Sequence, residues 1–222
     1  MISIPSCLII QEREREGSPA SEIKRVEDAI EVVYEIVDIP EEGMPTALLG
    51  KAYGIAVIPN VIKAAYGIGG RYGRGVLLVR TEEGDWSNPS FISLAGGSLG
   101  WQIGIQSADI ILVFKNRKTI ESISRGKFTL GADASVAAGP VGRHAEASTD
   151  IQLKAEIYSY SKSRGLFAGI SIEGAALQID HNANSDFYGR RYINPREIFW
   201  DREIEAPEIA RELRRLLSQY TE

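Results

Sequence analysis

Five basic residues and no acidic residue lie between Lys51 and Arg80, in a chain whose formal net charge is −5. These basic residues are Lys51, Lys63, Arg71, Arg74 and Arg80. Residues 67–75 set two of the arginines among glycines, where backbone N–H groups and guanidinium groups can surround a phosphate. The sequence therefore predicts an anion site at Arg71 and Arg74, with Lys51 and Lys63 adding positive charge. The alternative is a glycine-rich hairpin whose arginines are only solvated.

Nucleotide binding is not expected from this glycine-rich run. The run lacks the Gly-Lys-Ser/Thr ending of a P-loop, and the spacing of Gly67, Gly69 and Gly70 does not fit the dinucleotide fingerprint. The anion that the run would bind is therefore of another class.

A second basic pair, Lys162 and Arg164, lies at the turn between two predicted strands, where binding residues are often found. Beside it, Tyr158, Tyr160 and Phe167 predict an aromatic and basic surface for lipid headgroups or single-stranded nucleic acid. The alternative is a charged turn that keeps a hairpin soluble. Because the pI is about 5.3 and no nucleic-acid motif is present, no nucleic-acid partner is predicted.

Oxygen-bearing side chains alternate at Asp180, Asn182, Asn184 and Asp186, as the first ligands of a calcium loop do. The sixth position of such a loop requires glycine and the twelfth a bidentate glutamate, but Ser185 and Arg191 stand there. The four residues are therefore only a weak metal candidate. An Asx-rich turn explains them with fewer assumptions, and no metal is predicted.

The sequence does not predict catalysis or a cofactor. His144 and His181 are the only histidines, Cys7 is the only cysteine, and none of them lies in a metal or nucleophile motif. A hydrolase that used His144 would need a nucleophile that the sequence does not supply.

Length and composition indicate one globular domain: 222 residues, 44% of them hydrophobic. We expect residues 1–17 to be a flexible segment and residues 18–222 to form the domain. No apolar run approaches the roughly 18 to 20 residues that span a bilayer, and no usable signal peptide is present. The expected location is cytoplasmic, with peripheral membrane association open. An exported form also stays open if the start is truncated.

Nineteen of the 22 glycines lie between Gly50 and Gly174, so helices are expected near the two ends and strands between them. The predicted class is α+β: a strongly curved antiparallel sheet, with closure into a barrel left open, flanked by an N-terminal and a C-terminal helix. The helices are predicted at 19–39, 116–124 and 207–220, and the β-rich core at 50–193. The strands are predicted at 75–80, 90–94, 101–105, 110–114, 128–137, 151–160 and 167–179.

The N-terminal helix carries an apolar stripe that we expect to pack on the sheet. The stripe consists of Ile23, Val26, Ile30, Val33 and Val37. Residues 11–43 around it hold 11 acidic and four basic residues, a net of −7, which opposes insertion into an anionic bilayer.

Five successive segments resemble the motifs of the SYLF domain family, from about Ser21 to Trp200. These segments are 51–59, 86–91, 130–143, 158–174 and 187–189. The resemblance implies binding of phosphoinositide or other anionic lipid, as in eukaryotic members, actin association, as in yeast members, and no known catalysis.

This sequence differs from the eukaryotic members in two respects. No SH3 or FYVE domain fits in it, so it is more similar to the stand-alone bacterial arrangement. The helix before the glycine-rich block is acidic here, whereas in animal members it is basic and enters the membrane.

The predicted function is a non-catalytic module that binds anionic lipid or a membrane surface. Its predicted lipid and anion ligands are Lys51, Lys63, Arg71, Arg74, Lys162 and Arg164. The alternative is a protein-interaction or scaffold domain that is similar to actin-binding relatives and has no lipid ligand. The sequence leaves open the identity of the lipid, the oligomeric state, and whether the lipid is buried in the sheet or bound by its headgroup at the surface.

Overall fold

The computed structural model describes residues 18–37, 44–66, 68–99, 104–140, 154–163, 166–201 and 203–221. Helices lie at both ends of the described chain and strands lie between them, as the glycine distribution predicts. The helices are α1 (Pro19–Val37), α2 (Thr46–Gly50), α3 (Arg117–Ser124), α5 (His181–Tyr188), α6 (Pro195–Trp200) and α7 (Glu208–Gln219).

The described strands form one nine-stranded sheet in the order β5-β9-β3-β2-β1-β4-β7-β6, and β8 also pairs with β7. All described pairings are antiparallel except β6 with β7, which is parallel. The strands are β1 (Gly54–Tyr66), β2 (Ile68–Val79), β3 (Ser90–Leu99), β4 (Gly104–Phe114), β5 (Phe128–Thr129), β6 (Val136–Ala138), β7 (Ile157–Ser163), β8 (Leu166–Gly169) and β9 (Ala176–Ile179).

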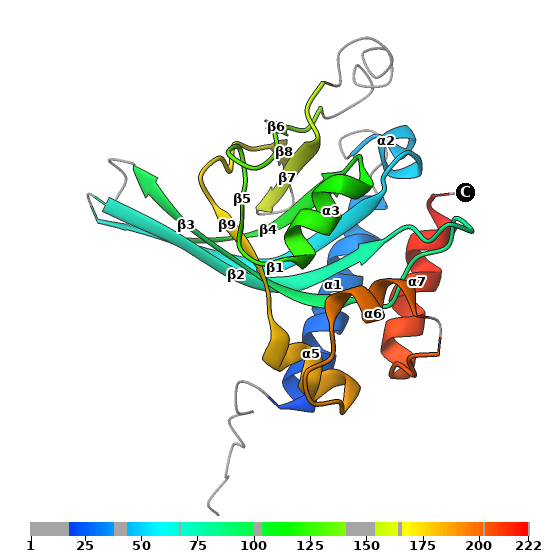
Figure 1. The fold of residues 1–222 in the computed structure, drawn as a ribbon. Coiled ribbons are helices and arrows are strands. Elements are labelled where there is room, and N and C mark those ends of the chain that lie inside the picture. The colour runs from blue at the N-terminus through cyan, green and yellow to red at the C-terminus, as the bar shows by residue number, and fades with distance from the viewer. Residues whose placement is uncertain are drawn as a thin grey trace, which may run out of the picture.

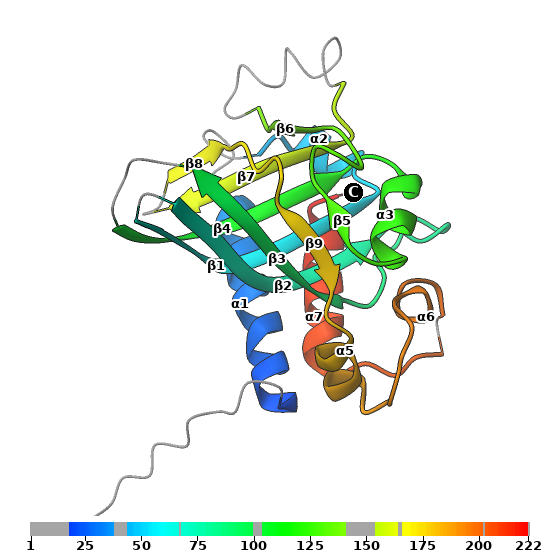
Figure 2. The same cartoon turned by 60° about the vertical axis from the view of Figure 1, so that its left-hand side comes forward.

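The sheet is strongly curled, with α1 and α7 on one side and α3 on the other (Figures 1 and 2). On one side, the helix face, α1 and α7 lie against residues such as Ile55, Val57 and Val76. On the other side, the inner face, residues such as Leu77 and Leu112 share a second core with α3 and the segment that leads into β9. The predicted α+β class, the curvature and the flanking helices are confirmed.

Some strand boundaries differ from the prediction for identifiable reasons. The predicted strands do not include β1, because Pro59 and Asn60 interrupt its alternating pattern with a β-bulge. The predicted strand 128–137 divides into β5 and β6 around a turn that contains Gly131 with a φ of 87°. Residues 101–103 and 151–153 lie outside the described residues.

Helix α1 packs through its apolar stripe, as expected. Val26, Ile30 and Val33 are buried in the core of the helix face, joined by Ala29 and Val32. Ile23 is 36% exposed, so its predicted burial is wrong, and the side chain of Val37 lies outside the described residues. Most of the stripe therefore stabilises the fold.

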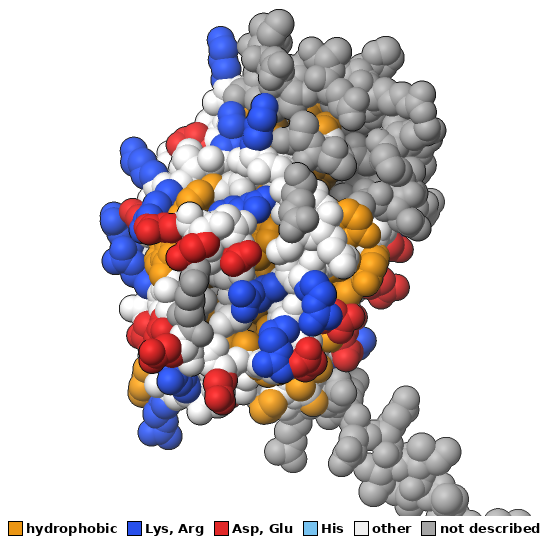
Figure 3. Space-filling model, turned by 90° about the vertical axis from the view of Figure 1, so that its right-hand side faces the viewer, with side chains coloured by type: hydrophobic (Ala, Val, Ile, Leu, Met, Phe, Trp, Pro, Cys, Tyr) orange, Lys and Arg blue, Asp and Glu red, His pale blue; other side chains and the backbone are white. Residues whose placement is uncertain are grey.

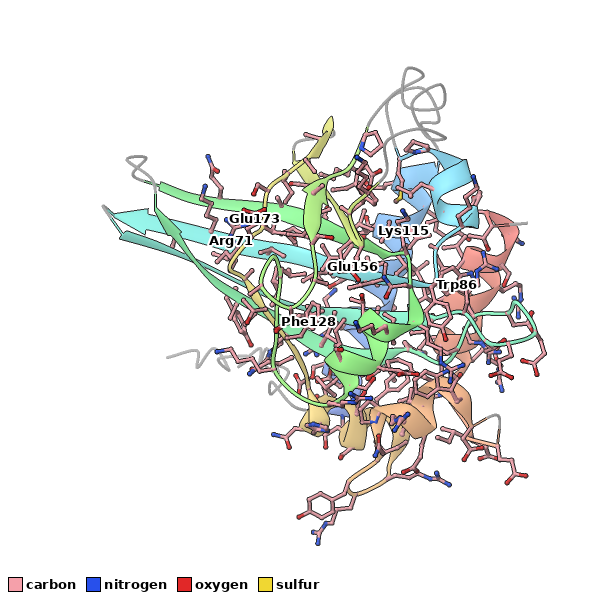
Figure 4. The ribbon with its side chains drawn as sticks, turned by 45° about the horizontal axis from the view of Figure 1, so that its top comes forward. Arg71, Trp86, Lys115, Phe128, Glu156 and Glu173 are labelled. Carbon is pink, nitrogen blue, oxygen red and sulfur yellow. The ribbon has the colours of Figure 1, made fainter. Side chains whose placement is uncertain are left out.

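Helix α3 is held against the inner face by a polar anchor at its start. The Asn116 side chain caps the helix by accepting a hydrogen bond from the Thr119 N–H group. Asn116 also donates to Glu156, whose other carboxylate oxygen accepts from the Ser135 N–H group. Figure 4 shows Glu156 beside the end of the sheet, far along it from Arg71. Helix α3 thus covers only one half of the inner face.

Gly73 and Gly75 allow β2 to approach the bulged part of β1. A Cβ atom on Gly75 would lie 2.1 Å from the Val57 carbonyl oxygen, and one on Gly73 would lie 2.6 Å from a methyl group of Val61. At Gly75 the added Cβ atom would collide with backbone atoms, which cannot rotate away as a side chain can.

Gly75→Ala is therefore expected to lower the free energy of unfolding by about 1 to 3 kcal/mol. The matched control is Gly97→Ala on β3, where an added Cβ atom would meet open space, and it should change stability by less than about 0.5 kcal/mol. Urea unfolding of both variants measures the difference. Equal stability of the two variants would contradict the close approach at Gly75.

Val26→Asp and Val33→Asp should each destabilise the protein by about 3 kcal/mol or more, because each places a carboxylate in the helix-face core. Tyr34→Asp is the control, since Tyr34 lies on the same helix and is 49% exposed. Thermal melting compares the three variants, and deletion of residues 1–16 should change the midpoint little. Variants that melt like wild type but lose vesicle binding would show instead that α1 is a membrane anchor.

Candidate functional site

A cationic pocket lies on the inner face, at the half of the sheet that α3 leaves uncovered. Lys63 of β1 is directly opposite Arg71 of β2 in the antiparallel ladder, so both side chains emerge on one face. Both line a cavity of about 240 Å³. Its other walls include the polar residues Gln106, Ser161 and Ser171 and the apolar residues Val61, Ile110 and Ile170.

The bulge in β1 decides that Lys63 faces this pocket. Ile58 pairs with Ile110 and Val61 pairs with Ala108, so β1 contains one more residue than β4 between these two pairs. Asn60 takes a left-handed φ of 52°, and its N–H group donates to the Asp109 carboxylate over 2.9 Å. The extra residue reverses the alternation of side chains beyond it.

One wall of the cavity contains Ile170 and Ser171, which belong to residues 170–175, the crossover segment. This segment connects β8, on one half of the curled sheet, with β9, on the other. The Ser159 hydroxyl donates to the Ile170 carbonyl over 2.6 Å, and the Ile170 N–H group donates back to the Ser159 carbonyl. The Arg71 guanidinium donates to the Ser171 carbonyl over 3.4 Å. Arg71 therefore joins the sheet to the crossover segment.

The pocket is positively charged, and one of its hydrogen-bond donors has no acceptor among the described residues. The Nε atom of Arg71 is buried and has no hydrogen-bond partner in the described part of the chain. Burial lowers the pKa of Arg71, but an arginine stays protonated in proteins. Glu173, labelled near Arg71 in Figure 4, packs against Gly131 and does not line the cavity. Within the described ranges, neither Lys63 nor Arg71 has a carboxylate at ion-pair distance.

The predicted pairing of Arg71 with Arg74 is wrong. The two residues are three positions apart on one strand, so their side chains lie on opposite faces of the sheet. Arg74 is on the helix face, where its Nε atom donates to the Tyr72 hydroxyl over 2.8 Å and its guanidinium lies over the Tyr72 ring.

Arg74 adjoins an ion cluster at the start of α1. Arg25 lies 2.9 Å from Glu22 and 3.7 Å from Asp180. Burial raises the pKa of Glu22, although Arg25 and, more weakly, Arg74 oppose the rise. The positive charge of Arg74 is thus partly balanced by acidic residues of the same face.

The other predicted basic ligands do not join the pocket. Lys51 is exposed after α2, at the opposite end of β1. Lys162 is on the helix face and pairs with Glu35 of α1. Arg164 lies outside the described residues. Only Lys63 and Arg71, of the six predicted residues, are therefore together in the described structure.

The predicted aromatic surface beside Lys162 is also wrong. Tyr158 and Tyr160 are buried in the helix-face core, and the Tyr160 hydroxyl donates to the Pro140 carbonyl. Ile157 of the same strand is buried in the inner core, so this part of β7 is covered on both sides. The side chain of Phe167 lies outside the described residues.

The weak metal candidate at residues 180–186 lies in a helix and its cap, where the sequence predicts an Asx-rich turn. Asp180 caps α5 by accepting from the Ala183 N–H group, and its carboxylate also faces Arg25. Asn184 is buried and accepts from the Phe91 N–H group over 2.8 Å. Helical geometry turns alternate residues by about 200°, so Asn182 and Asp186 cannot converge with them on one ion. No metal-binding group of three His, Cys, Asp or Glu side chains occurs among the described residues.

The remaining chemical candidates are not close to the pocket. His181 is exposed as the first residue of α5. His144 and Cys7 lie outside the described residues. Sequence reasoning did not predict Gln106, Ser161 and Ser171. They come close to Lys63 and Arg71 only through the pairing of strands that are distant in sequence, and no local motif marks them.

A larger cavity of about 450 Å³ lies at the other end of the molecule, between the β2–β3 connection, α6 and α7. Acidic residues such as Asp85 and Asp201 line it together with Arg117 and Arg214. Figure 3 shows this side of the protein with acidic and basic side chains interspersed. Its mixed charge does not favour an anion, unlike the Lys63–Arg71 pocket.

Comparison with known proteins places the chain in a family. The family model described as Ysc84, Las17-binding protein actin regulator, matches residues 95–220. The chain belongs to the Ysc84 family. The SYLF resemblance is confirmed, since SYLF is another name of the Ysc84 domain. The matched range contains Gln106, Ser161 and Ser171, whereas Lys63 and Arg71 precede it.

Two groups of relatives extend the match. The SH3 domain-containing YSC84-like protein 1 of Xenopus laevis is 40% identical over 184 residues, which are 82% of this chain and 54% of that protein. The human protein of the same name is 32% identical over 210 residues, 92% of this chain and 60% of its own. The LAS seventeen-binding protein 3 of Saccharomyces cerevisiae is 40% identical over 152 residues, 67% of this chain and 33% of its own.

The chain therefore spans about half to three fifths of the animal relatives and a third of the yeast relative. The Ysc84 family is described as an actin regulator, and its description names no enzyme activity. None of the described helices combines the length and the apolar character needed to cross a membrane.

In this Ysc84-family protein, Asp180 is expected to stabilise α5 without binding calcium. Asp180→Ala should cost about 0.5 to 2 kcal/mol through loss of the helix cap, and loss of the contact with Arg25 adds to it. Added calcium should leave the melting temperature of wild type unchanged. Micromolar calcium affinity in a calorimetric titration, abolished by Asp180→Ala, would contradict this interpretation.

Proposed function

We propose that this protein is a non-catalytic membrane-interaction module that binds an anionic lipid headgroup at the Lys63–Arg71 pocket. The observation that carries the proposal is the pair of cations on one face, with no carboxylate at ion-pair distance among the described residues. An uncompensated pair of this kind attracts an anion. Among the described residues, the buried Nε–H group of Arg71 also lacks an acceptor.

The walls of the pocket favour a lipid over a fully polar anion. Val61, Ile110 and Ile170 line the same cavity as the cations and the serine hydroxyl groups. A headgroup would contact the polar wall, and the first carbon atoms of the lipid would contact the apolar wall. Pockets that combine a mostly apolar lining with a few placed polar groups are typical of small-ligand sites.

Membrane binding through α1 is not supported by its packing. Val26, Ile30 and Val33 are buried in the helix-face core, so the stripe would have to leave the fold to enter a bilayer. That separation would cost about 1.5 to 3 kcal/mol for each buried side chain. The inner-face pocket needs no such rearrangement.

A protein-interaction or scaffold role is the second candidate, and the names of the relatives favour it. The yeast relative is named for binding Las17, and the animal relatives contain an SH3 domain by name. In this chain, Ile62 and Tyr72 are opposite each other on the helix face and are 53% and 49% exposed. Such an apolar pair could contact a protein without a lipid.

Vesicle sedimentation tests the lipid proposal. Wild type should bind phosphatidylcholine vesicles that contain a mixture of phosphatidic acid, phosphatidylserine and phosphatidylinositol, and should bind pure phosphatidylcholine weakly. Arg71→Gln should weaken binding to the mixture about fivefold, since one cation near the surface contributes ~1 kcal/mol. Binding should fall as salt rises from about 0.1 M to about 1 M, because the Debye length shortens from about 10 to about 3 Å.

Arg74→Gln is the matched control for this experiment. It removes the same charge three residues away on the same strand, but from the opposite face. Its binding should stay close to that of wild type, and thermal melting checks that both variants are folded. Equal binding of wild type to neutral and anionic vesicles would refute the lipid proposal and leave the protein-interaction role.

A further inference from the structure

We infer that the Lys63–Arg71 pocket selects a phosphate monoester, so that its lipid ligand has a terminal phosphate as its whole headgroup. This inference rests on the proposed function and names the ligand class of the same site. Phosphatidic acid is the simplest lipid with this chemistry, and glycerol 3-phosphate is its soluble counterpart.

Charge balance is the first argument. Lys63 and Arg71 supply two positive charges to the cavity, and no acidic residue is among its described lining residues. A phosphate monoester carries about −1.5 to −2 charges at neutral pH, which matches the two cations. A phosphodiester bears a single negative charge on its phosphate and would leave one cation unbalanced.

Size is the second argument. The cavity of about 240 Å³ is smaller than the roughly 300 to 1,000 Å³ of pockets for drug-sized ligands. At about 30 Å³ for each water-sized group, it holds about eight such groups. A phosphate with its glycerol carbons fits this space. An inositol ring with further phosphates exceeds this volume and would have to extend out of the pocket.

Hydrogen bonding is the third argument. The guanidinium group of Arg71 and the ammonium group of Lys63 are donors on the sheet side of the cavity. Ser161 of β7 is on the inner face beside Ile110, and Gln106 of β4 is opposite Lys63, so both add donors. A monoester presents three terminal oxygens to these donors, whereas a diester presents two. The donors therefore suit the monoester better.

The test compares single anionic lipids at equal vesicle charge. Phosphatidylcholine vesicles contain phosphatidic acid, phosphatidylserine or phosphatidylinositol 4,5-bisphosphate in amounts that give the same zeta potential. Wild type should bind the phosphatidic acid vesicles at least about tenfold more tightly than the other two. The variant with Lys63→Gln and Arg71→Gln should lose this preference, whereas Lys63→Arg, which keeps the charge, and Arg74→Gln should retain it.

The pH dependence provides an independent readout. The second ionisation of a phosphate monoester lies near pH 6, so the preference for phosphatidic acid over phosphatidylserine should shrink from about pH 7.5 to about pH 5.5. Lys63 and Arg71 are the titratable groups that line the cavity, and an arginine stays protonated in proteins. The neighbouring Glu173 and Asp109 are common to wild type and the Lys63→Arg variant, so both proteins should show the same pH dependence.

A calorimetric titration with glycerol 3-phosphate separates a lipid from a free phosphate ester. Competition by glycerol 3-phosphate against phosphatidic acid vesicles supports the inference. Binding of glycerol 3-phosphate without any vesicle binding would refute the proposed lipid function and leave a site for a soluble phosphate monoester. Equal binding to all three anionic vesicles, or a preference for the bisphosphate, would overturn the inference while leaving the lipid function intact.

Discussion

One extra residue in β1 determines which side chains share the inner face. Before the bulge, Ile55 and Val57 face the helices, and regular alternation would send Lys63 to that side too. Asn60 adopts the left-handed conformation that asparagine tolerates better than most residues, and the alternation reverses beyond it. Val61 then joins the inner core, and Lys63 comes to the side of Arg71. The pocket depends on this single reversal.

The neighbouring elements are adapted to the bulge. Gly73 and Gly75 leave room on β2 for the displaced part of β1, where larger residues would collide with Val61 and with the Val57 carbonyl. The crossover segment lies against the same face, where Ala175 approaches Gly96 and the Ser171 carbonyl accepts a hydrogen bond from Arg71. A cavity is left because α3 covers only the other half of the inner face. The shape of the pocket thus depends on the glycines of β2 and on the part of the inner face that α3 does not cover.

Charge is distributed between the two faces by the acidic helix α1. On the helix face, Glu35 pairs with Lys162, and Glu22 lies beside Arg25 and lowers the local positive potential near Arg74. These carboxylates act on cations of their own face and are separated by the sheet from Lys63 and Arg71. The acidity that opposes insertion of α1 into an anionic bilayer therefore has a structural role. The positive charges of Lys63 and Arg71 on the inner face are therefore not neutralised by the carboxylates of α1.

The amino-acid sequence by itself determined the α+β class, the flanking helices, the burial of Val26, Ile30 and Val33 in α1, and the basic character of residues 51–80, because periodicity and composition are local properties. It also placed Lys63 and Arg71 among the candidate ligands. Only the tertiary structure decided that these two meet while Arg74 and Lys162 lie on the opposite face. A face is set by the register and by the bulge at Asn60, and both depend on strands that are distant in sequence. For the same reason, the helix at 181–188 took the place of a turn: its cap faces Arg25, and its Asn184 binds the backbone of β3.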